Sequence, residues 1–277
     1  MNKSGLLWMA LLVFLLCTLP ASGEEAPSVW TMTFEDTFDG DQIDPLKWQF
    51  QLGTGQSEGL VLWGNNEQEY YRAENASVEN GLLTIRAKQE QKGGMPYTSA
   101  RLCTKGLFAQ CYGRFEARIR LPGGEGFWPA FWLMPRDEIY GFWAASGEID
   151  ILEAKGRLPG LTYHSVHFGG VCPDNTHITE SFMLPEGTYG DFHVYALEWT
   201  DREMRWYVDD TLAATQRLWY TAGHDFPAPF DQPFYVILNL AVGGNFDQNR
   251  MPGTLGGPLE ASMEVDYVRI FARAQGR

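Results

Sequence analysis

The chain is short of positive charge and of long apolar segments. Its 277 residues carry 21 Lys and Arg against 35 Asp and Glu, a formal net charge of −14. Nucleic acids and anionic membranes reward clustered Lys and Arg, so we expect neither as a partner. The longest apolar run, residues 6–16, is too short to span a bilayer. Thirty Gly and 15 Pro exclude a helix bundle.

The first 23 residues have the composition of a signal peptide. A lysine precedes the apolar run, and the small residues 21–23 provide a cleavage site. We therefore expect residues 1–23 to be removed near Gly23 and the protein to be secreted, either to the outside or to the periplasm. A lipid anchor at Cys17 is a weaker alternative, because a bulky leucine precedes it.

Few cysteines follow this leader, although export permits disulfides. Cys103 and Cys111 flank a turn-like segment and could pair across adjacent strands, which would leave Cys172 single. It is equally consistent with the sequence that all three are small, mostly buried residues. No sequence context supports a catalytic cysteine.

Residues 24–277 contain no linker, repeat or charge block, so we predict one domain. Apolar and polar residues alternate in short runs separated by Gly, Pro, Asn and Asp, and the pair Asp209-Asp210 predicts a hairpin turn. The predicted strands are 30–38, 82–87, 112–121, 192–199, 204–208, 234–241 and 263–271. Such a pattern predicts an all-β sandwich of antiparallel strands, in which the first and last runs pair.

An acidic run, SGEIDILEAKG at residues 146–156, carries the chemistry. Glu148 and Asp150 share one face of a strand, and Glu153 joins that face only if a β-bulge adds one residue near Ile151-Leu152. Three carboxylates on one face repel each other, so either a metal neutralises them or they share protons for acid–base chemistry. Retaining glycosidases use two carboxyl groups roughly 5–5.5 Å apart.

With this motif, the sequence resembles glycoside hydrolase family 16 and its bacterial laminarinase-like endo-β-1,3-glucanases. The family motif Glu-x-Asp-x-x-Glu stands here as Glu148, Asp150 and Glu153, and similar stretches extend over residues 30–272. The resemblance implies a β-jelly-roll sandwich with a concave substrate cleft. It makes Glu148 the nucleophile, Asp150 its assistant and Glu153 the general acid/base.

The 10 Trp residues fit a sugar-binding protein, because flat indoles bind the apolar faces of sugar rings. Trp128 and Trp143 are predicted sugar platforms, whereas Trp132 could equally pack in the core. Trp199 and Trp206 lie in alternating runs and are expected in the core or on the convex face.

The resemblance also implies polar contacts with the substrate. These would come from Arg101, from Asn65 or its neighbour Asn66, from His167 near the acid/base, and from Asn245. The alternatives are turn residues for the asparagine pair and a satisfied core position for the histidine. The chain departs from the family pattern at Ala144, where Pro is common, and at Phe246, where Trp is usual.

No cofactor is needed for the implied reaction, but the resemblance implies a structural calcium held by Glu35, Gly81 and Asp266. Such an ion would join the first and last strands. The alternative is that backbone amides satisfy Asp266.

The implied activity is endo-hydrolysis of internal β-1,3 bonds in laminarin-type glucans, with retention of configuration. We expect a monomer that binds β-glucan polysaccharides or oligosaccharides. Alternatives on the same fold are hydrolysis of mixed-linkage β-1,3-1,4-glucan or of agar- or carrageenan-type galactans, and non-catalytic β-glucan recognition. A calcium-dependent lectin is disfavoured because the acidic strand offers Ile and Leu where further oxygen ligands would be needed.

Overall fold

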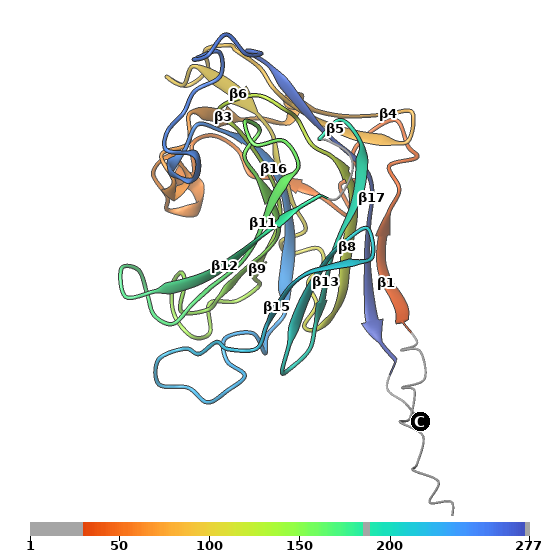
Figure 1. The fold of residues 1–277 in the computed structure, drawn as a ribbon, viewed down its shortest axis with the longest axis vertical. Helices are drawn as coiled ribbons and strands as arrows, with labels where there is room; N and C mark the ends of the chain where they lie inside the picture. Colours follow the sequence, from red (N-terminus) through yellow and green to blue (C-terminus); the bar gives the residue numbers. More distant parts are fainter. Residues whose placement is uncertain (1–29, 185–188, 275–277) are drawn as a thin grey trace, which may run out of the picture.

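Two large antiparallel sheets pack face to face in the computed structural model, which describes residues 30–184 and 189–274 (Figure 1). The predicted signal peptide, residues 1–23, lies outside the described residues. We call the two layers the cleft sheet and the outer sheet. Within the described residues, no helix is long and apolar enough to cross a membrane.

The cleft sheet curves around a concave face, which lies on the left in Figure 1 between strand β12 (Thr176–Met183) and the loops that carry the short helices η1 (Gln56–Glu58) and η2 (Leu62–Gly64). In spatial order its strands are β12 (Thr176–Met183), β11 (Leu161–Phe168), β10 (Glu148–Ala154), β9 (Phe127–Pro135), β16 (Phe234–Val242), β7 (Arg101–Cys103) and β2 (Gln49–Phe50). The acidic strand β10 therefore lies inside the sheet, with a neighbour on each side.

The outer sheet covers the other side of the cleft sheet. Its strands are, in spatial order, β15 (Thr211–Gln216), β14 (Met204–Val208), β13 (Phe192–Trp199), β8 (Gly113–Arg120), β17 (Ala261–Arg273), β5 (Leu82–Ala87) and β4 (Ala76–Glu79), with β1 (Trp30–Asp36) paired to β17. Apolar residues of both sheets fill the space between them. Strand β8 shows the alternation that causes this, since every second residue, such as Phe115, is buried.

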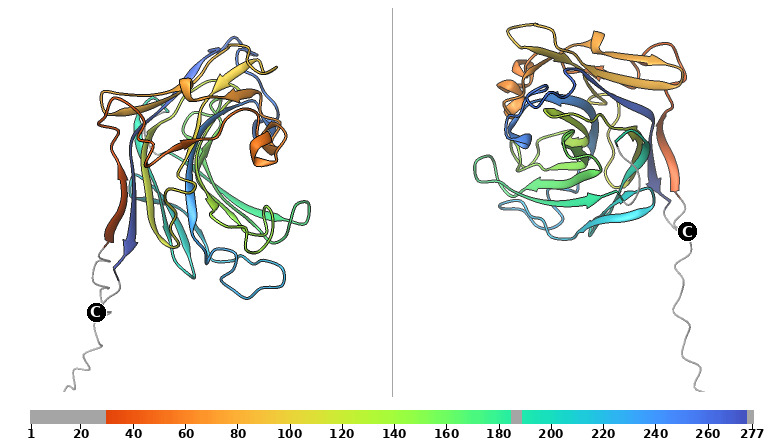
Figure 2. Two further views of the ribbon diagram at one scale, coloured as in Figure 1. Left: turned by 180° about the vertical axis from the view of Figure 1, so that it is seen from behind. Right: turned by 45° about the horizontal axis from the view of Figure 1, so that its top comes forward.

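The predicted strands are confirmed. Strands β5, β13 and β14 begin and end at the expected residues, and β8, β16 and β17 differ by one or two residues. The predicted pairing of the first and last runs is also confirmed: Trp30 lies opposite Arg273, and β1 and β17 run side by side in both views of Figure 2. Asp209 and Asp210 form the turn between β14 and β15 with φ of 47° and 65°.

A small parallel pair was not expected from the sequence. Strand β3 (Glu69–Tyr71) runs parallel to β6 (Tyr97–Ser99). Parallel neighbours need a crossover connection, and the β4–β5 hairpin of the outer sheet supplies it. Four short 3₁₀ helices complete the described structure: η1 (Gln56–Glu58), η2 (Leu62–Gly64), η3 (Ala73–Asn75) and η4 (Asn245–Asp247).

The three cysteines of the described residues are all unpaired thiols: Cys103 is buried, Cys111 is half-buried and Cys172 is exposed. The structure therefore agrees with the alternative in which no disulfide joins Cys103 to Cys111.

Candidate active site

Strand β10 contains the predicted β-bulge. Asp150 lies opposite Ser165 on β11, and Glu153 lies opposite Tyr163, so two residues on β10 face only His164 on its partner. The pairing with β9 shifts at the same place. This extra residue restores the parity of Glu153, as a bulge does.

Two side chains hold the bulge by bonding to its carbonyl groups. Trp206 of the outer sheet donates its indole N–H to the carbonyl of Asp150 at 2.9 Å, and His164 Nδ1 lies 2.8 Å from the carbonyl of Ile151. Burial lowers the pKa of His164 to about 4, so its ring is neutral and donates from Nδ1. The carbonyls that the irregular ladder would leave unpaired are thus satisfied.

As a result, Glu148, Asp150 and Glu153 all line one cleft, which has a volume of about 1260 Å³. The residues between and beside them, Ile149, Ile151 and Leu152, are fully buried in the core. The predicted separation of acidic and apolar side chains is therefore confirmed.

Glu148 accepts a hydrogen bond from the indole N–H of Trp143 at 2.7 Å, and His167 Nε2 lies 3.7 Å from its other carboxylate oxygen. Burial and the nearby charge of Asp150 raise the pKa of Glu148 to about 7. The positive charge of His167 and the N–H of Trp143 limit the rise, because both stabilise the ionised carboxylate.

Glu153 has a different set of neighbours. It accepts hydrogen bonds from the indole N–H of Trp128 at 3.0 Å and from the hydroxyl of Ser165 at 3.5 Å. Burial, together with the charges of Asp150 and Glu148, raises the pKa of Glu153 well above its usual value. The two glutamates thus lie in one cleft with different neighbours, the arrangement that lets one carboxyl hold a proton while the other is ionised.

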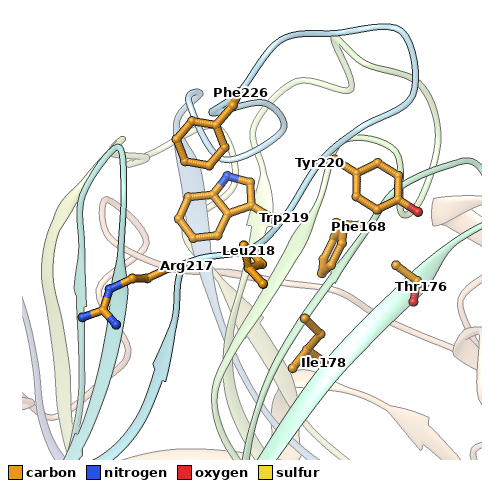
Figure 3. Close-up of a pocket in the computed structure, with 8 residues that line it drawn as sticks. All are labelled: Phe168, Thr176, Ile178, Arg217, Leu218, Trp219, Tyr220 and Phe226. Carbon is orange, nitrogen blue, oxygen red and sulfur yellow. The ribbon is translucent and has the colours of Figure 1, made fainter.

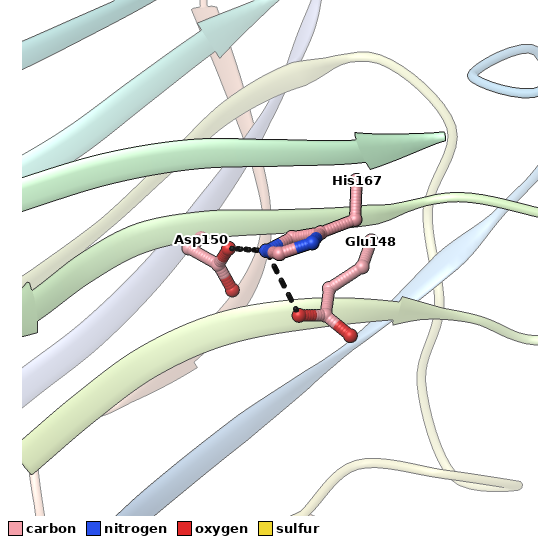
Figure 4. Close-up of side chains that lie close together, drawn as sticks. All are labelled: Glu148, Asp150 and His167. Carbon is pink, nitrogen blue, oxygen red and sulfur yellow. Dashed lines mark ion pairs between the residues drawn. The ribbon is translucent and has the colours of Figure 1, made fainter. Parts of the chain in front are cut away.

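His167 bridges the acidic group (Figure 4). Its Nε2 lies 3.3 Å from a carboxylate oxygen of Asp150 and points toward Glu148 as well. Burial alone would lower the pKa of His167, but the charges of Glu148 and Asp150 outweigh it and raise the pKa to about 10. The three residues could be read as metal ligands, since their atoms lie within 4.8 Å of one another. In this arrangement His167 pairs with both carboxylates, so that its own charge offsets theirs.

The predicted sugar-binding residues all line this cleft: Asn65, Arg101, Trp128, Trp132, Trp143, His167 and Asn245. Trp128 stacks on Phe246, with ring centroids 4.9 Å apart and an interplanar angle of 27°. Trp132 reaches the cleft, whereas the fully or almost fully buried Trp199 and Trp206 belong to the core, as expected.

Asn65 and Asn245 meet at the rim, where the backbone N–H of Asn245 donates to the carbonyl of Asn65 at 2.7 Å. The neighbouring Asn66 does not line the cleft. It has a φ of 58°, typical of a turn, and donates to Asn249 at 2.8 Å.

The residues that form this site lie within a segment whose sequence matches a known protein family. Residues 63–269 match the sequence profile of the glycosyl hydrolases family 16. The chain belongs to glycosyl hydrolase family 16. Its two-sheet β-fold, described above, is also the fold of solved family members.

Relatives of this family 16 protein cover most of its length. The glucan endo-1,3-beta-glucosidase A1 of Niallia circulans is 41% identical over 257 residues, which are 87% of this chain and 37% of that protein. The beta-glucanase of Rhodothermus marinus is 40% identical over 273 residues, 94% of this chain and 91% of that one. The solved catalytic domain of an endo-1,3-beta-glucanase (laminarinase) from Thermotoga petrophila RKU-1 has 35% identity and a TM-score of 0.79, covering 90% of this chain and all of that one.

The predicted calcium ligands of the family 16 chain already have positive partners. Asp266 accepts a hydrogen bond from Arg118 at 2.6 Å, and Glu35 accepts one from Arg269 at 2.8 Å. Each carboxylate is thus already paired with an arginine through one of its oxygens, and nothing below depends on a calcium ion there.

Sequence reasoning missed three buried residues at the cleft floor: Glu67, Tyr71 and Asn239. Glu67 accepts a hydrogen bond from Asn65 and Asn239 accepts one from Trp132, whereas Tyr71 connects Asn239 to Glu67. A signal was present: a lone asparagine interrupts the apolar run 234–242, and Glu67, Glu69 and Tyr71 alternate along one face of a short segment.

A second hollow of about 480 Å³ lies near the loop that follows β15, behind β11 and β12 (Figure 3). Its lining is mostly aromatic and aliphatic: Phe168, Thr176, Ile178, Arg217, Leu218, Trp219, Tyr220 and Phe226. Because none of these residues is a carboxylic acid, this hollow has no acid–base pair for glycoside hydrolysis.

Proposed function

We propose that this family 16 glycoside hydrolase cleaves internal β-1,3 bonds of laminarin-type glucans and retains the anomeric configuration. One observation carries the proposal: a bulged strand aims Glu148 and Glu153 into one cleft, where the His167 cation lies beside Glu148. The relatives named above, an endo-1,3-β-glucosidase and a laminarinase among them, support β-1,3-glucan as the substrate.

In this proposal Glu148 is the nucleophile and Glu153 the general acid/base. The ionised Glu148 attacks the anomeric carbon and forms a glycosyl ester, while Glu153 gives its proton to the departing glycosidic oxygen. Glu153, now ionised, takes a proton from water, whose oxygen then displaces Glu148 from the sugar. The neighbours support this order of roles, because the His167 cation beside Glu148 stabilises an ionised carboxylate, while burial raises the pKa of Glu153 and favours its protonated form.

Asp150 and His167 are assigned to positioning and charge balance. The His167 cation lies close to both Asp150 and Glu148, so it stabilises the carboxylate that must attack. Trp143 donates to the same carboxylate and also presents its ring to the cleft, where a sugar face can stack on it.

Mixed-linkage glucan, galactans and non-catalytic glucan recognition are the alternatives. A recognition protein has no need for acid–base carboxyls, whereas all three motif carboxylates line the cleft here. The net charge of −14 disfavours strongly anionic sulfated galactans. We therefore favour hydrolysis of an uncharged β-glucan.

The proposal is tested by product analysis on laminarin, lichenan, curdlan and agarose side by side. We expect oligosaccharides of mixed length from laminarin and no products from agarose. Equal or greater release from lichenan would replace β-1,3-glucan with mixed-linkage glucan as the substrate. Binding without any hydrolysis would make the protein a recognition module.

The mechanism is tested with Glu148→Ala and Glu153→Ala, which should both abolish turnover of laminarin. Added azide should rescue Glu148→Ala by forming a glycosyl azide of inverted configuration, because a small anion can occupy the space of the missing nucleophile. Rescue with inversion in Glu153→Ala instead would exchange the two roles.

We further propose secretion after cleavage near Gly23, a single catalytic domain over 24–277 and a monomer that binds β-glucan. The composition of residues 1–23 supports export, and the two packed sheets with a shared core support one domain. Calcium at Glu35, Gly81 and Asp266 stays a prediction from the resemblance, and the arginine partners described above speak against it.

A further inference from the structure

The cleft floor contains a buried polar network. It lies beyond β9, whereas His167 lies on the opposite side of β10, on β11. We call it the floor network: Glu67, Tyr71, Asn239, Trp132 and Asn65. Glu67, Tyr71 and Asn239 are at most 4% exposed. Glu67 and Asn239 nevertheless line the cleft together with Asn65 and Trp132, whereas Tyr71 does not. The hydrolytic steps proposed above use none of the buried members.

Every hydrogen bond of the floor network leads, from donor to acceptor, toward Glu67. Trp132 donates its indole N–H to the Asn239 side-chain oxygen at 2.8 Å, and the Asn239 amide donates to the Tyr71 hydroxyl oxygen at 3.0 Å. Tyr71 then donates to Glu67 Oε2 at 3.0 Å. The other oxygen of Glu67 accepts from the Asn65 amide at 3.4 Å. Both branches therefore end on the carboxylate of Glu67.

Glu67 accepts a hydrogen bond on each of its two oxygens, from Tyr71 and from Asn65, and its ionised form satisfies both donors. The neighbouring Glu69 accepts the backbone N–H of Val242 at 2.6 Å. Burial raises the pKa of both carboxyls, and for Glu69 the charge of Glu67 adds to it, so that its pKa lies well above its usual value. Glu67 is therefore the carboxylate on which the network converges.

Arg101 offsets the charge of Glu67 and packs its guanidinium against two tryptophan rings. Its positive charge lowers the pKa of Glu67, and its guanidinium lies 4.5 Å from the Trp63 ring centroid and 4.7 Å from that of Trp132. Its Nε also donates to Gln51 at 2.6 Å. Trp132 is therefore held at its edge by Asn239 and on its face by Arg101.

We propose that Glu67 is a positioning residue that orients two sugar-binding side chains: Asn65 directly, and Trp132 through Tyr71 and Asn239. This rests on the proposed glucan hydrolysis and names the residue that prepares one half of its binding cleft. An amide or indole that can turn binds a sugar less well, because its orientation must be restricted on binding. A carboxylate at the end of the network accepts hydrogen bonds and cannot donate them. Each side chain of the network must therefore turn its donor group toward Glu67.

The test is Glu67→Gln, with Glu69→Gln as its matched control. Glutamine at position 67 turns an N–H₂ group toward one of the donors, so a contact of the network is lost. Glutamine at position 69 replaces a carboxyl of similar size beside Glu67 and removes none of the hydrogen bonds of the floor network. A lost hydrogen bond to a charged group lowers binding about tenfold. We expect Glu67→Gln to raise KM for laminarin about tenfold with kcat little changed, and Glu69→Gln to leave both near the wild-type values.

A thermal unfolding curve for each variant shows whether it folds. A second variant, Tyr71→Phe, covers the case in which Glu67→Gln does not. Tyr71→Phe removes one hydroxyl, which separates Glu67 from Asn239 but leaves its contact with Asn65. It should raise KM less than Glu67→Gln does, again with kcat kept. If Glu67→Gln does not fold, Tyr71→Phe decides: a wild-type KM overturns the proposal.

Other outcomes also decide. A folded Glu67→Gln protein with unchanged KM overturns the proposal, as does an equal rise of KM in Glu69→Gln, or a loss of kcat alone. If the wild-type protein does not hydrolyse laminarin, the proposed function fails on its own. Titration calorimetry with laminari-oligosaccharides then tests the positioning role, with the same ranking expected in Kd.

Discussion

At the scale of single residues, the difference between Glu148 and Glu153 comes from their neighbours. Each carboxylate accepts one indole N–H, from Trp143 and Trp128 respectively, but only Glu148 lies beside the His167 cation within ion-pair distance. In the proposed mechanism this asymmetry favours an ionised Glu148 and a protonated Glu153, so we expect it to set the pH range of activity.

We predict a bell-shaped pH profile of kcat/KM whose acid limb lies near pH 7. Activity is lost as the pH falls through the pKa of Glu148, which must be ionised, and as it rises through the raised pKa of Glu153, which must be protonated. In Trp143→Phe the carboxylate of Glu148 loses a donor, so its pKa rises and the acid limb moves to higher pH.

Trp128→Phe is the matched control for this profile. It removes the donor to Glu153, so the alkaline limb should move up while the acid limb stays. An acid limb that does not move in Trp143→Phe would show that Glu148 is not the group that must lose its proton.

The sequence predicted the residues that act at the surface of the cleft better than those that support them. Glu148, Asp150 and Glu153 could be placed because all three lie within one strand, where parity and a single bulge decide which face each side chain takes. The network through Asn239 could not, because it joins segments more than 160 positions apart, Asn239 with Tyr71, and only through them does Glu67 reach Trp132. Alternation within one strand carries no information about such partners.

At the scale of the element, strand β10 depends on side chains from two other strands. Its bulge was predictable from parity alone, but the groups that bond to it, Trp206 and His164, were not. Trp206 belongs to the outer sheet and was expected only as a core or convex-face residue. Its indole joins the outer sheet to the cleft sheet at the bulge, where the pairing register of β10 shifts.

We predict that Trp206→Phe lowers both stability and activity. The change leaves the buried carbonyl of Asp150 without its donor, which costs about 1–3 kcal/mol in the free energy of unfolding. It also frees the bulge that aims Glu153 into the cleft, so kcat should fall. Urea denaturation and laminarin kinetics measure the two effects.

Trp199→Phe is the control for this change. Trp199 is also fully buried, but among the described residues its indole nitrogen has no hydrogen-bond partner. It should lose stability through the smaller ring while kcat stays near the wild-type value. Equal losses of kcat in both variants would show that the bond to Asp150 does not position the site.

At the scale of the whole molecule, sheet packing rather than covalent cross-links holds the described fold together. The strands and the pairing of β1 with β17 could be predicted because alternation shows directly on a half-buried strand. The parallel pair β3–β6 could not, because three residues are too few to show a period.

We predict that a reducing agent leaves the midpoint of thermal unfolding unchanged. Cys103, Cys111 and Cys172 are free thiols, so no disulfide restricts the unfolded chain. Differential scanning calorimetry with and without dithiothreitol measures this. A lower midpoint in the reduced sample would reveal a bond between two of them, with Cys103 and Cys111 the first pair to examine by mass spectrometry.

The pairing of β1 with β17 has a practical consequence for attaching the enzyme to other molecules. Trp30 and Arg273 are neighbours across the two strands, and both belong to the outer sheet rather than to the cleft. A tether to a solid support, or a fused carbohydrate-binding module, would therefore leave the body of the enzyme from the same spot whichever terminus carried it. Either design keeps the groove open to incoming polysaccharide.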